Sequence, residues 1–416
     1  MFLTREDEAL LNGEHGEGAE IAMSVLVKLG EMYNADRMLN VENVHVDGAA
    51  YGWINDSGLE LVERLCNSGA CFRVPATLNP SSIDFDMWKE LKVPSWVAEK
   101  QFRLANALKK MGATPTWTCA PYQYGADIRF GQNVAWGESN AVGFANTVVG
   151  ARTERLGDLA DVCSAIVGKY PNFGLYRDEN RLGQILFEPS KKDLETFDQT
   201  DYGILGFFIG SIAEAKVPVV SGIPKNVTTD QLKSYCAAAA VGGSVALSHL
   251  CGVTPEAKTV ADAFHGSRPE ERITIETDQL EQTRQKLSTL KRDDPDVICL
   301  GCPHCSVQEL TRLARLLKGK KVKKDVRLLI LTSRAAKTLA AEMGTIETIE
   351  SSGGKVIADT CWNFVPFKGK TLMTDSVKMA WVSMSRFAEV GIGNMDRCVE
   401  AAVRAMRWGE SLWQKS

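Results

Sequence analysis

The sequence lacks a stretch that could cross a membrane and a segment that could direct secretion. Its most apolar runs, 202–215 and 237–252, are interrupted by Gly, Glu or His before they reach the ~20 residues that a membrane span requires. The N-terminal segment, MFLTREDEALLNGE, is acidic where a signal peptide needs a basic segment followed by an apolar one. We therefore expect the apolar runs to be buried core and the protein to be cytoplasmic.

The chain also lacks an excess of charge of one sign. Its 48 Lys and Arg against 52 Asp and Glu give a formal net charge of -4. This balance provides no general attraction to nucleic acid or to anionic lipid. We expect a small-molecule substrate held by a local site, with no nucleic-acid or membrane partner.

What the chain does have is length and a regular alternation of strands and helices. With 416 residues it is too long for one compact core, so two or three α/β domains are expected. Strand–helix alternation favours a mostly parallel sheet. In the last third the patterns predict strands at 296–304, 326–333 and 353–362, helices at 306–319 and 333–344, and an amphipathic helix pair from 375 onward.

Cysteine is abundant, with eleven residues in all. An odd count without a secretion signal indicates a reducing compartment, where thiols more often bind metals or do chemistry than form disulfides. Cys299 lies inside a predicted strand and is expected to pack in the core. Four other cysteines lie in helix-like patterns and are also expected to be buried core residues: Cys66, Cys163, Cys236 and Cys398.

The segment 299–306, CLGCPHCS, contains two overlapping Cys-x-x-Cys spacings. This spacing fits zinc, a redox dithiol or ligation of an iron–sulfur cluster. Zinc is the weaker interpretation, because a structural zinc site recruits a second Cys or His pair and the sequence offers none. A redox pair formed by Cys302 and Cys305 stays open, since the motif follows a strand and opens a helix.

A cluster held by three thiols is the competing interpretation. Cys302 and Cys361 fall at the carboxyl ends of predicted parallel strands, the edge where open α/β sheets bind ligands. Cys119 lies near the end of another strand-like segment, 114–122. A metal centre with one open position can act as a Lewis acid that assists the departure of a hydroxyl group as water. Cys305 remains an alternative ligand to Cys302.

Other residues offer polar contacts for a substrate. His304, beside Cys302, could protonate a leaving hydroxyl or play a structural role. The turn Gly16-Glu17-Gly18 precedes a predicted helix and could hold an anion or be a plain turn. A dense polar set follows at Glu138, Ser139, Asn140, Asn146, Arg152 and Arg155. Its two arginines could clamp a carboxylate or phosphate, or pair with Glu154 and Asp158 at the surface.

Four motifs in combination resemble the large subunit of the aconitase X family. They are NGEHGEG (12–18), WGESNAVGFANTVVGARTERLGD (136–158), CLGCPHCS (299–306) and IADTCW (357–362). The resemblance implies an α/β, aconitase-like fold of three α/β/α domains with mostly parallel sheets, lacking the swivelling domain. The expected domains are 1–160, with 370–416 as a candidate completion, then 161–275 and 276–369.

The resemblance also implies the cofactor and the roles of residues. Cys119, Cys302 and Cys361 would ligate an iron–sulfur cluster, preferably [4Fe-4S], with a smaller cluster or mononuclear iron as alternatives. His304, Glu138 and Asn140 are the catalytic candidates. The substrate-binding candidates are Gly16, Glu17, Gly18, Ser139, Asn146, Arg152 and Arg155.

A partner and two possible reactions follow from the same resemblance. No swivelling domain follows Ser416, so a separate small subunit is expected to form a heterodimer with this chain and to supply a catalytic Ser. The expected reaction is dehydration of (R)-5-phosphomevalonate to trans-anhydromevalonate 5-phosphate in an archaeal mevalonate pathway. The alternative is dehydration of cis-3-hydroxy-L-proline. A non-enzymatic alternative is an iron–sulfur scaffold or thiol redox sensor that uses Cys302 and Cys305.

Overall fold

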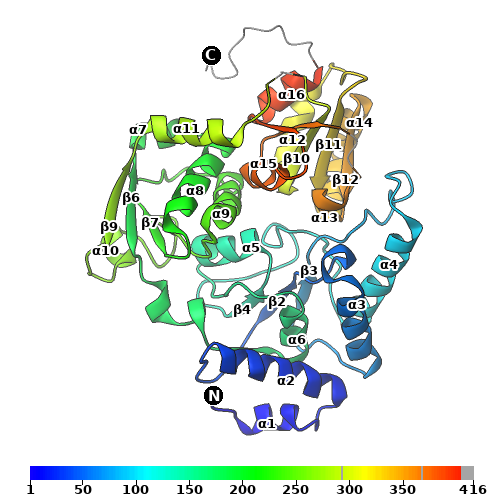
Figure 1. Cartoon of the computed structure of the whole chain (residues 1–416), viewed down its shortest axis with the longest axis vertical. Coiled ribbons are helices and arrows are strands. Elements are labelled where there is room, and N and C mark those ends of the chain that lie inside the picture. The colour runs from blue at the N-terminus through cyan, green and yellow to red at the C-terminus, as the bar shows by residue number, and fades with distance from the viewer. Residues whose placement is uncertain (292–293, 367–368, 404–416) are drawn as a thin grey trace.

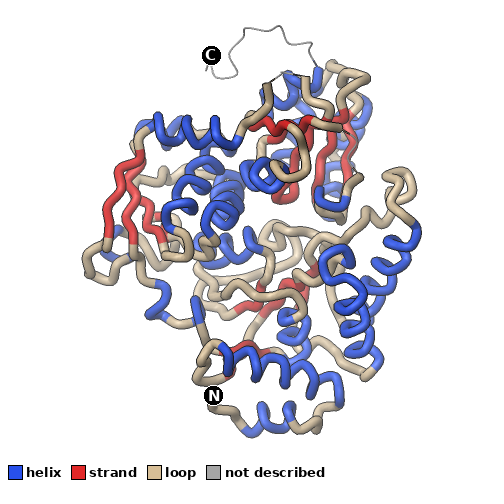
Figure 2. Tube along the Cα trace, in the orientation of Figure 1, coloured by secondary structure: helices blue, strands red, loops and turns tan. Residues whose placement is uncertain are grey.

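The structure, a computed structural model, describes residues 1–291, 294–366 and 369–403. Three mostly parallel sheets follow one another along the chain, each with its own helices (Figure 1). Figure 2 shows the strands of each sheet gathered in a separate part of the molecule. The predicted α/β fold with parallel sheets is confirmed.

The first sheet has the order β3-β2-β4, and all its strands are parallel. Helices α1 to α6 accompany it, and a short antiparallel pair, β1 with β5, lies beside α2. The strands are β1 (Met38–Asn40), β2 (Asn43–Val46), β3 (Ala76–Leu78), β4 (Val134–Trp136) and β5 (Lys169–Pro171). The helices are α1 (Arg5–Leu11), α2 (Glu17–Met32), α3 (Tyr51–Asn67), α4 (Ser95–Met111), α5 (Ser139–Phe144) and α6 (Ala160–Val167).

The second sheet, β8-β7-β6-β9, is also parallel. Its strands are β6 (Ile185–Pro189), β7 (Pro218–Val220), β8 (His249–Leu250) and β9 (Glu271–Ile275). Its helices are α7 (Lys191–Thr196), α8 (Gln199–Ala213), α9 (Thr229–Gly243), α10 (Val260–Ala263) and α11 (Thr277–Leu287). A Cβ at Gly206 in α8 would lie 2.4 Å from the carbonyl oxygen of Tyr235 in α9, so glycine permits this close packing. The two apolar runs of the sequence are thus largely core, and no described helix is long and apolar enough to span a membrane.

The third sheet has five parallel strands in the order β12-β11-β10-β13-β14. The strands are β10 (Val297–Cys305), β11 (Arg327–Thr332), β12 (Gly354–Ala358), β13 (Thr371–Thr374) and β14 (Glu389–Ile392). The helices are α12 (Val307–Leu317), α13 (Arg334–Glu342), α14 (Thr345–Ser351), α15 (Val377–Ser383) and α16 (Met395–Val403). β13 and β14 therefore join the third sheet, whereas the sequence left open an assignment of 370–416 to the first domain. Residues 404–416 of that segment lie outside the described residues.

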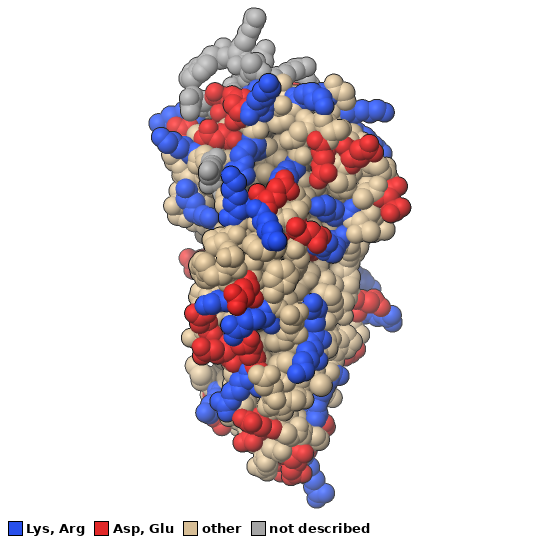
Figure 3. All heavy atoms as spheres, turned by 90° about the vertical axis from the view of Figure 1, so that its right-hand side faces the viewer, with Lys and Arg blue, Asp and Glu red and all other residues tan. Residues whose placement is uncertain are grey.

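The surface carries no single dominant charge on the face shown in Figure 3, where basic and acidic side chains are interspersed. Ion pairs of the protein include Arg103 with Glu63 and Arg334 with Asp86. The mixture agrees with the small net charge of the whole chain. A broad basic surface for a polyanion is not present on this face.

Candidate active site

The thiols of Cys119, Cys302 and Cys361 line one cavity of about 240 Å³. The cavity lies between the first sheet and the third, which face each other near the centre of the molecule with α15 beside them (Figure 1). Cysteines separated by up to 242 positions in the chain thus come together. The other lining residues are Asp47, Trp53, Asn79, Pro80, Glu138, Asp158, Pro303, Trp362, Asn363, Lys378 and Val382.

The first sheet contributes polar residues from the carboxyl ends of its strands. Asp47 directly follows β2, Asn79 directly follows β3, and Glu138 follows β4 by two residues. Parallel strands end at one edge of a sheet, which is where ligands bind in open α/β folds. Asn79 connects the other two: its Nδ2 donates to Oδ1 of Asp47 and, at 3.4 Å, to Oε2 of Glu138.

The third sheet contributes Cys302 from the irregular last part of β10, and Cys361 follows β12 by three residues. Gly301, just before Cys302, has φ 97°, and a Cβ there would lie 2.1 Å from the carbonyl oxygen of Leu331. Only glycine fits this irregular part of β10 without moving the neighbouring strand. The hydroxyl of Ser376 donates to the carbonyl of Cys302, which fixes the same part of β10 from the side of α15.

Backbone and amide groups hold the thiols in place. The backbone N–H of His304 donates to Sγ of Cys119 at 3.3 Å, which links the third sheet to the loop of the first. Nδ2 of Asn363 lies 3.7 Å from Sγ of Cys361. Asn140 donates from Nδ2 to the carbonyl oxygen of Cys119 at 2.7 Å. Cys119 is therefore held by residues of the first and the third domain, and Cys361 by a residue of its own loop.

Lys378 of α15 provides the one Lys or Arg among the residues that line the cavity. Its Nζ lies 2.6 Å from Oε1 of Glu138 and 3.0 Å from Oγ of Ser139. The side chains of the ion pair are only 17% and 14% exposed. Burial alone would raise the pKa of Glu138, but the charge and hydrogen bond of Lys378 outweigh it and lower the pKa to about 2.

The donor set fits a soft metal centre. Thiolates are the preferred ligands of iron–sulfur clusters, and three of them face one space here. Burial raises the pKa of Cys302 to about 11 and that of Cys361 to about 12. A bound cation would have to displace these protons, as metals do when thiols ligate them. The lining holds no histidine, so these thiols are the softest ligands it offers.

His304 and Cys305 lie next to this cavity but do not line it. The side chain of His304 is buried; its Nε2 lies 3.0 Å from the carbonyl oxygen of Thr360, and burial lowers its pKa to about 4. Its Nδ1 is buried and has no hydrogen-bond partner among the described residues. Cys305 packs in the apolar core of the third domain with Ile298 and Leu310. Cys299 is also buried in an apolar cluster.

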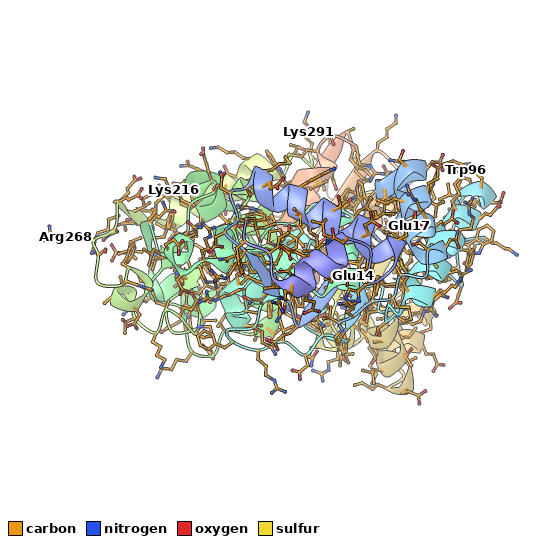
Figure 4. All side chains as sticks on the ribbon, turned by 90° about the horizontal axis from the view of Figure 1, so that it is seen from below. Glu14, Glu17, Trp96, Lys216, Arg268 and Lys291 are labelled. Carbon is orange, nitrogen blue, oxygen red and sulfur yellow. The ribbon has the colours of Figure 1, made fainter. Side chains whose placement is uncertain are left out.

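The structure places the expected substrate-binding residues in different surroundings. Ser139 and Asn140 contact Glu138 at the edge of the cavity. Asn146 is buried and donates to the carbonyl oxygens of Thr153 and Ala246. The turn Gly16-Glu17-Gly18 lies at the N-terminus of α2, where Figure 4 shows Glu14 and Glu17 on the end of the molecule seen from below.

The two arginines are held outside the cavity lining. Arg152 donates to the carbonyl oxygen of Tyr176 at 3.0 Å and pairs with Asp178. Arg155 donates to the carbonyl oxygen of Ser244 and lies 3.3 Å from Glu154. Both guanidinium groups are therefore engaged by acceptors of this chain.

Three lining residues carry chemistry that the sequence analysis did not single out: Asp47, Asn79 and Lys378. For Asp47 and Asn79 the signal was available, because each is a polar residue directly after a buried strand. Lys378 is a lone cation in the apolar segment VKMAWV, which a search for buried charges would have found. Its partner, Glu138, is 240 positions away, and only the fold brings the two together.

Three α/β domains, with a cysteine-lined cavity between the first and the third, define the class: an enzyme of aconitase type. Sequence profiles of the aconitase X first, second and third domains match residues 1–179, 183–285 and 295–404. A crystal structure of aconitase X from Thermococcus kodakaraensis in its holo-form superimposes with a TM-score of 0.87 at 35% identity, covering 97% of this chain and 100% of that one. The chain belongs to the aconitase X family.

The relatives carry two names. The phosphomevalonate dehydratase large subunit of Methanocaldococcus jannaschii is 38% identical over 91% of this chain and 94% of its own length. The cis-3-hydroxy-L-proline dehydratase of Pseudomonas aeruginosa is 36% identical over 95% of this chain and 69% of its own length. Both are dehydratases, so the prediction of a hydro-lyase is confirmed at the level of reaction class. An iron–sulfur cluster is what membership of an aconitase-like family implies.

Proposed function

We propose that the chain is the large subunit of a cytoplasmic heterodimeric dehydratase that converts (R)-5-phosphomevalonate to trans-anhydromevalonate 5-phosphate in a mevalonate pathway. The observation that carries the proposal is the cavity formed by Cys119, Cys302 and Cys361 with the Glu138–Lys378 pair. The substrate is supported by four relatives named phosphomevalonate dehydratase large subunit. They are 37–39% identical to this chain, and the alignments cover 93–100% of their own lengths.

The three thiols would hold an iron–sulfur cluster, preferably [4Fe-4S]. Bound there, the cluster supplies a Lewis acid for the hydroxyl that leaves as water. The residues of this chain bind and orient the substrate around it. Lys378, although paired with Glu138, is the cation of the lining that can approach an anionic group of the substrate. Ser139 and Asn140 also donate hydrogen bonds to Oε1 of Glu138, the oxygen that Lys378 contacts.

A small subunit is the proposed partner, since the relatives of this length are named large subunits. We propose that it covers the cavity and supplies a serine that takes the proton from the carbon next to the departing hydroxyl. A base on this second chain explains why the lining described here shows no serine, histidine or free lysine positioned as a general base. The isolated chain should then show no turnover.

One observation favours cis-3-hydroxy-L-proline as a second candidate substrate. The cavity carries three carboxyl groups, those of Asp47, Glu138 and Asp158, against the single cation of Lys378. An acidic lining suits the ammonium group of an amino acid better than a phosphate, which carries about −1.5 to −2 charges at pH 7. A phosphate substrate would therefore depend more on cations from the partner.

The experiment is an assay of both substrates with the anaerobically purified complex of the chain and its small subunit. Formation of the unsaturated product is followed by NMR, and Cys119→Ala in the same complex serves as the matched control. Water loss from phosphomevalonate but not from hydroxyproline is the expected result. Water loss from hydroxyproline alone would reassign the substrate, and no product from either would reject the proposed function.

A further inference from the structure

Asp47 lines the cavity, and the proposed dehydratase function gives it no role. It directly follows β2, the central strand of the first sheet, and it lines the same space as the three cysteines. The backbone of Asp47 is held in place, because its N–H donates to the carboxyl group of Asp161 in α6. The side chain therefore has a defined direction at the strand end where a substrate binds.

The two oxygens of the Asp47 carboxyl group differ in their surroundings. Oδ1 accepts a hydrogen bond from Nδ2 of Asn79. Among the described residues, no donor is found for Oδ2, and this oxygen is accessible rather than sealed in the core. Asn79 is itself oriented by His45, whose Nε2 lies 3.2 Å from its Oδ1. One oxygen is thus anchored, and the other is available to a bound molecule.

The charged groups around Asp47 favour its protonated form. Glu138 beyond β4, together with Asp158 and Asp161 at α6, faces it with negative charge, and Lys378 of α15 is the opposing cation. Burial raises the pKa of Asp47 well above its usual range, and the three carboxylates raise it further. Glu138 lies in the same cavity with its pKa lowered to about 2. When the surroundings move the pKa values of two carboxyl groups apart in this way, the group with the raised pKa is suited to donate a proton, and the other stays ionised.

Histidine, the usual proton donor, is not available to this cavity from the described residues. No histidine lines it, and the two that lie nearby, His45 and His304, are buried. Nε2 of His45 is engaged by Asn79 and Nε2 of His304 by the carbonyl oxygen of Thr360. Burial lowers the pKa of both imidazoles to about 4, so they are neutral at physiological pH.

We propose that Asp47 is the catalytic acid that protonates the departing hydroxyl group of the substrate. This inference rests on the proposed dehydratase function. The bond between carbon and the hydroxyl oxygen breaks with its electron pair on oxygen, and that oxygen takes the proton from the Asp47 carboxyl group to form water. The proton on the adjacent carbon passes to the base, and its bonding electrons form the double bond. The base then returns its proton through solvent to the Asp47 carboxylate, which balances the cycle.

Asp47→Asn tests the proposal, because it keeps the size and the contact with Asn79 but cannot transfer a proton. In the complete two-subunit enzyme we expect kcat to fall by roughly 10²–10⁴-fold, the usual contribution of general acid catalysis. Iron content, the absorption and EPR spectra, and substrate affinity measured by spectral titration should stay at the wild-type level. Asp47→Glu, which keeps a carboxyl group, should restore at least a tenth of the wild-type kcat.

The pH profile supplies a readout that a purely structural role would not change. A raised pKa means that the acid is protonated below it, so kcat/KM of the wild type should fall as pH rises through that pKa. Asp47→Asn should lack this limb. Should the variant fail to fold, the wild-type profile decides: a falling alkaline limb supports the proposal, and a flat one overturns it.

Three results would overturn the assignment while leaving the dehydratase function intact. They are a kcat of Asp47→Asn above a tenth of the wild type, loss of iron from that variant, and a larger loss of kcat in Asp158→Asn than in Asp47→Asn. Absence of water loss from either substrate with the wild-type enzyme would instead reject the proposed function itself. The two failures are therefore distinguishable.

Discussion

Replacement of Lys378 by Met should destabilise the protein measurably, because it leaves a buried carboxylate without its cation. The pKa of Glu138 is about 2 against an ordinary value of 4.5, a difference that corresponds to a stabilisation on the order of 3 kcal/mol at neutral pH. Measured losses of one partner of a buried pair are of similar size, roughly 3–5 kcal/mol. We therefore expect Lys378→Met to cost about 3 kcal/mol at pH 7.

The sign of the pH dependence follows from the lowered pKa. Stabilisation by the pair is complete above the ordinary pKa of Glu138 and is lost as pH falls toward about 2. In the variant, burial without Lys378 raises the pKa of Glu138, so the carboxyl group can take up a proton. The cost of the substitution should thus shrink between pH 7 and pH 5.

The assay is urea unfolding of the metal-free chain, with a double-mutant cycle that combines Lys378→Met and Glu138→Gln. Lys216→Met is the matched control, because the Lys216–Glu270 pair is 48% and 52% exposed (Lys216 is labelled in Figure 4). Exposed pairs contribute little, so the control should unfold like the wild type. Equal effects of Lys378→Met and Lys216→Met, or no coupling in the cycle, would refute the reasoning.

Two further predictions concern Cys302 in the third domain and Lys233 in α9 of the second domain, whose ammonium group pairs with Glu309 in α12 of the third. Cys302→Ala should abolish iron binding by the anaerobically reconstituted chain, measured by iron analysis and EPR. Cys305→Ala should retain iron, because the Cys305 thiol packs with core residues. Loss of iron only in the Cys305 variant would reverse the ligand assignment. Lys233→Met should lower the stability by roughly 3–5 kcal/mol in thermal or urea unfolding, since this fully buried ammonium pairs with Glu309 and lies 3.2 Å from the carbonyl oxygen of His304. A cost below about 1 kcal/mol would contradict the importance of that pair.

The sequence predicted the third sheet well because its signals are local. The strands expected at 296–304, 326–333 and 353–362 correspond to β10, β11 and β12, with α12 and α13 between them. In β10 and β11 an apolar run is followed by an amphipathic helix, α12 and α13, which is the pattern of a buried parallel strand and its covering helix. Cys302 and Cys361 reach one sheet edge for the same reason.

Other features depend on contacts that no local pattern records. The segment from 375 was expected to be a helix pair, but β14 lies between α15 and α16, because four residues extend the sheet beside β13. Arg152 and Arg155 resembled an anion clamp, yet carbonyl and carboxylate groups from other parts of the chain engage both. The pairing of Lys378 with Glu138 likewise exists only after two domains have met.

The backbone N–H of His304 that donates to the sulfur of Cys119 joins the third sheet to a loop of the first domain. A metal bound by all three thiols would therefore cross-link the first and third domains, in addition to taking part in catalysis. Part of the free energy of metal binding would then offset the entropy cost of closing the chain loop between Cys119 and Cys302, which are 183 positions apart. Loss of the metal would then loosen the domain junction itself, so damage by oxygen should be seen as easier proteolysis between these domains as well as lost turnover.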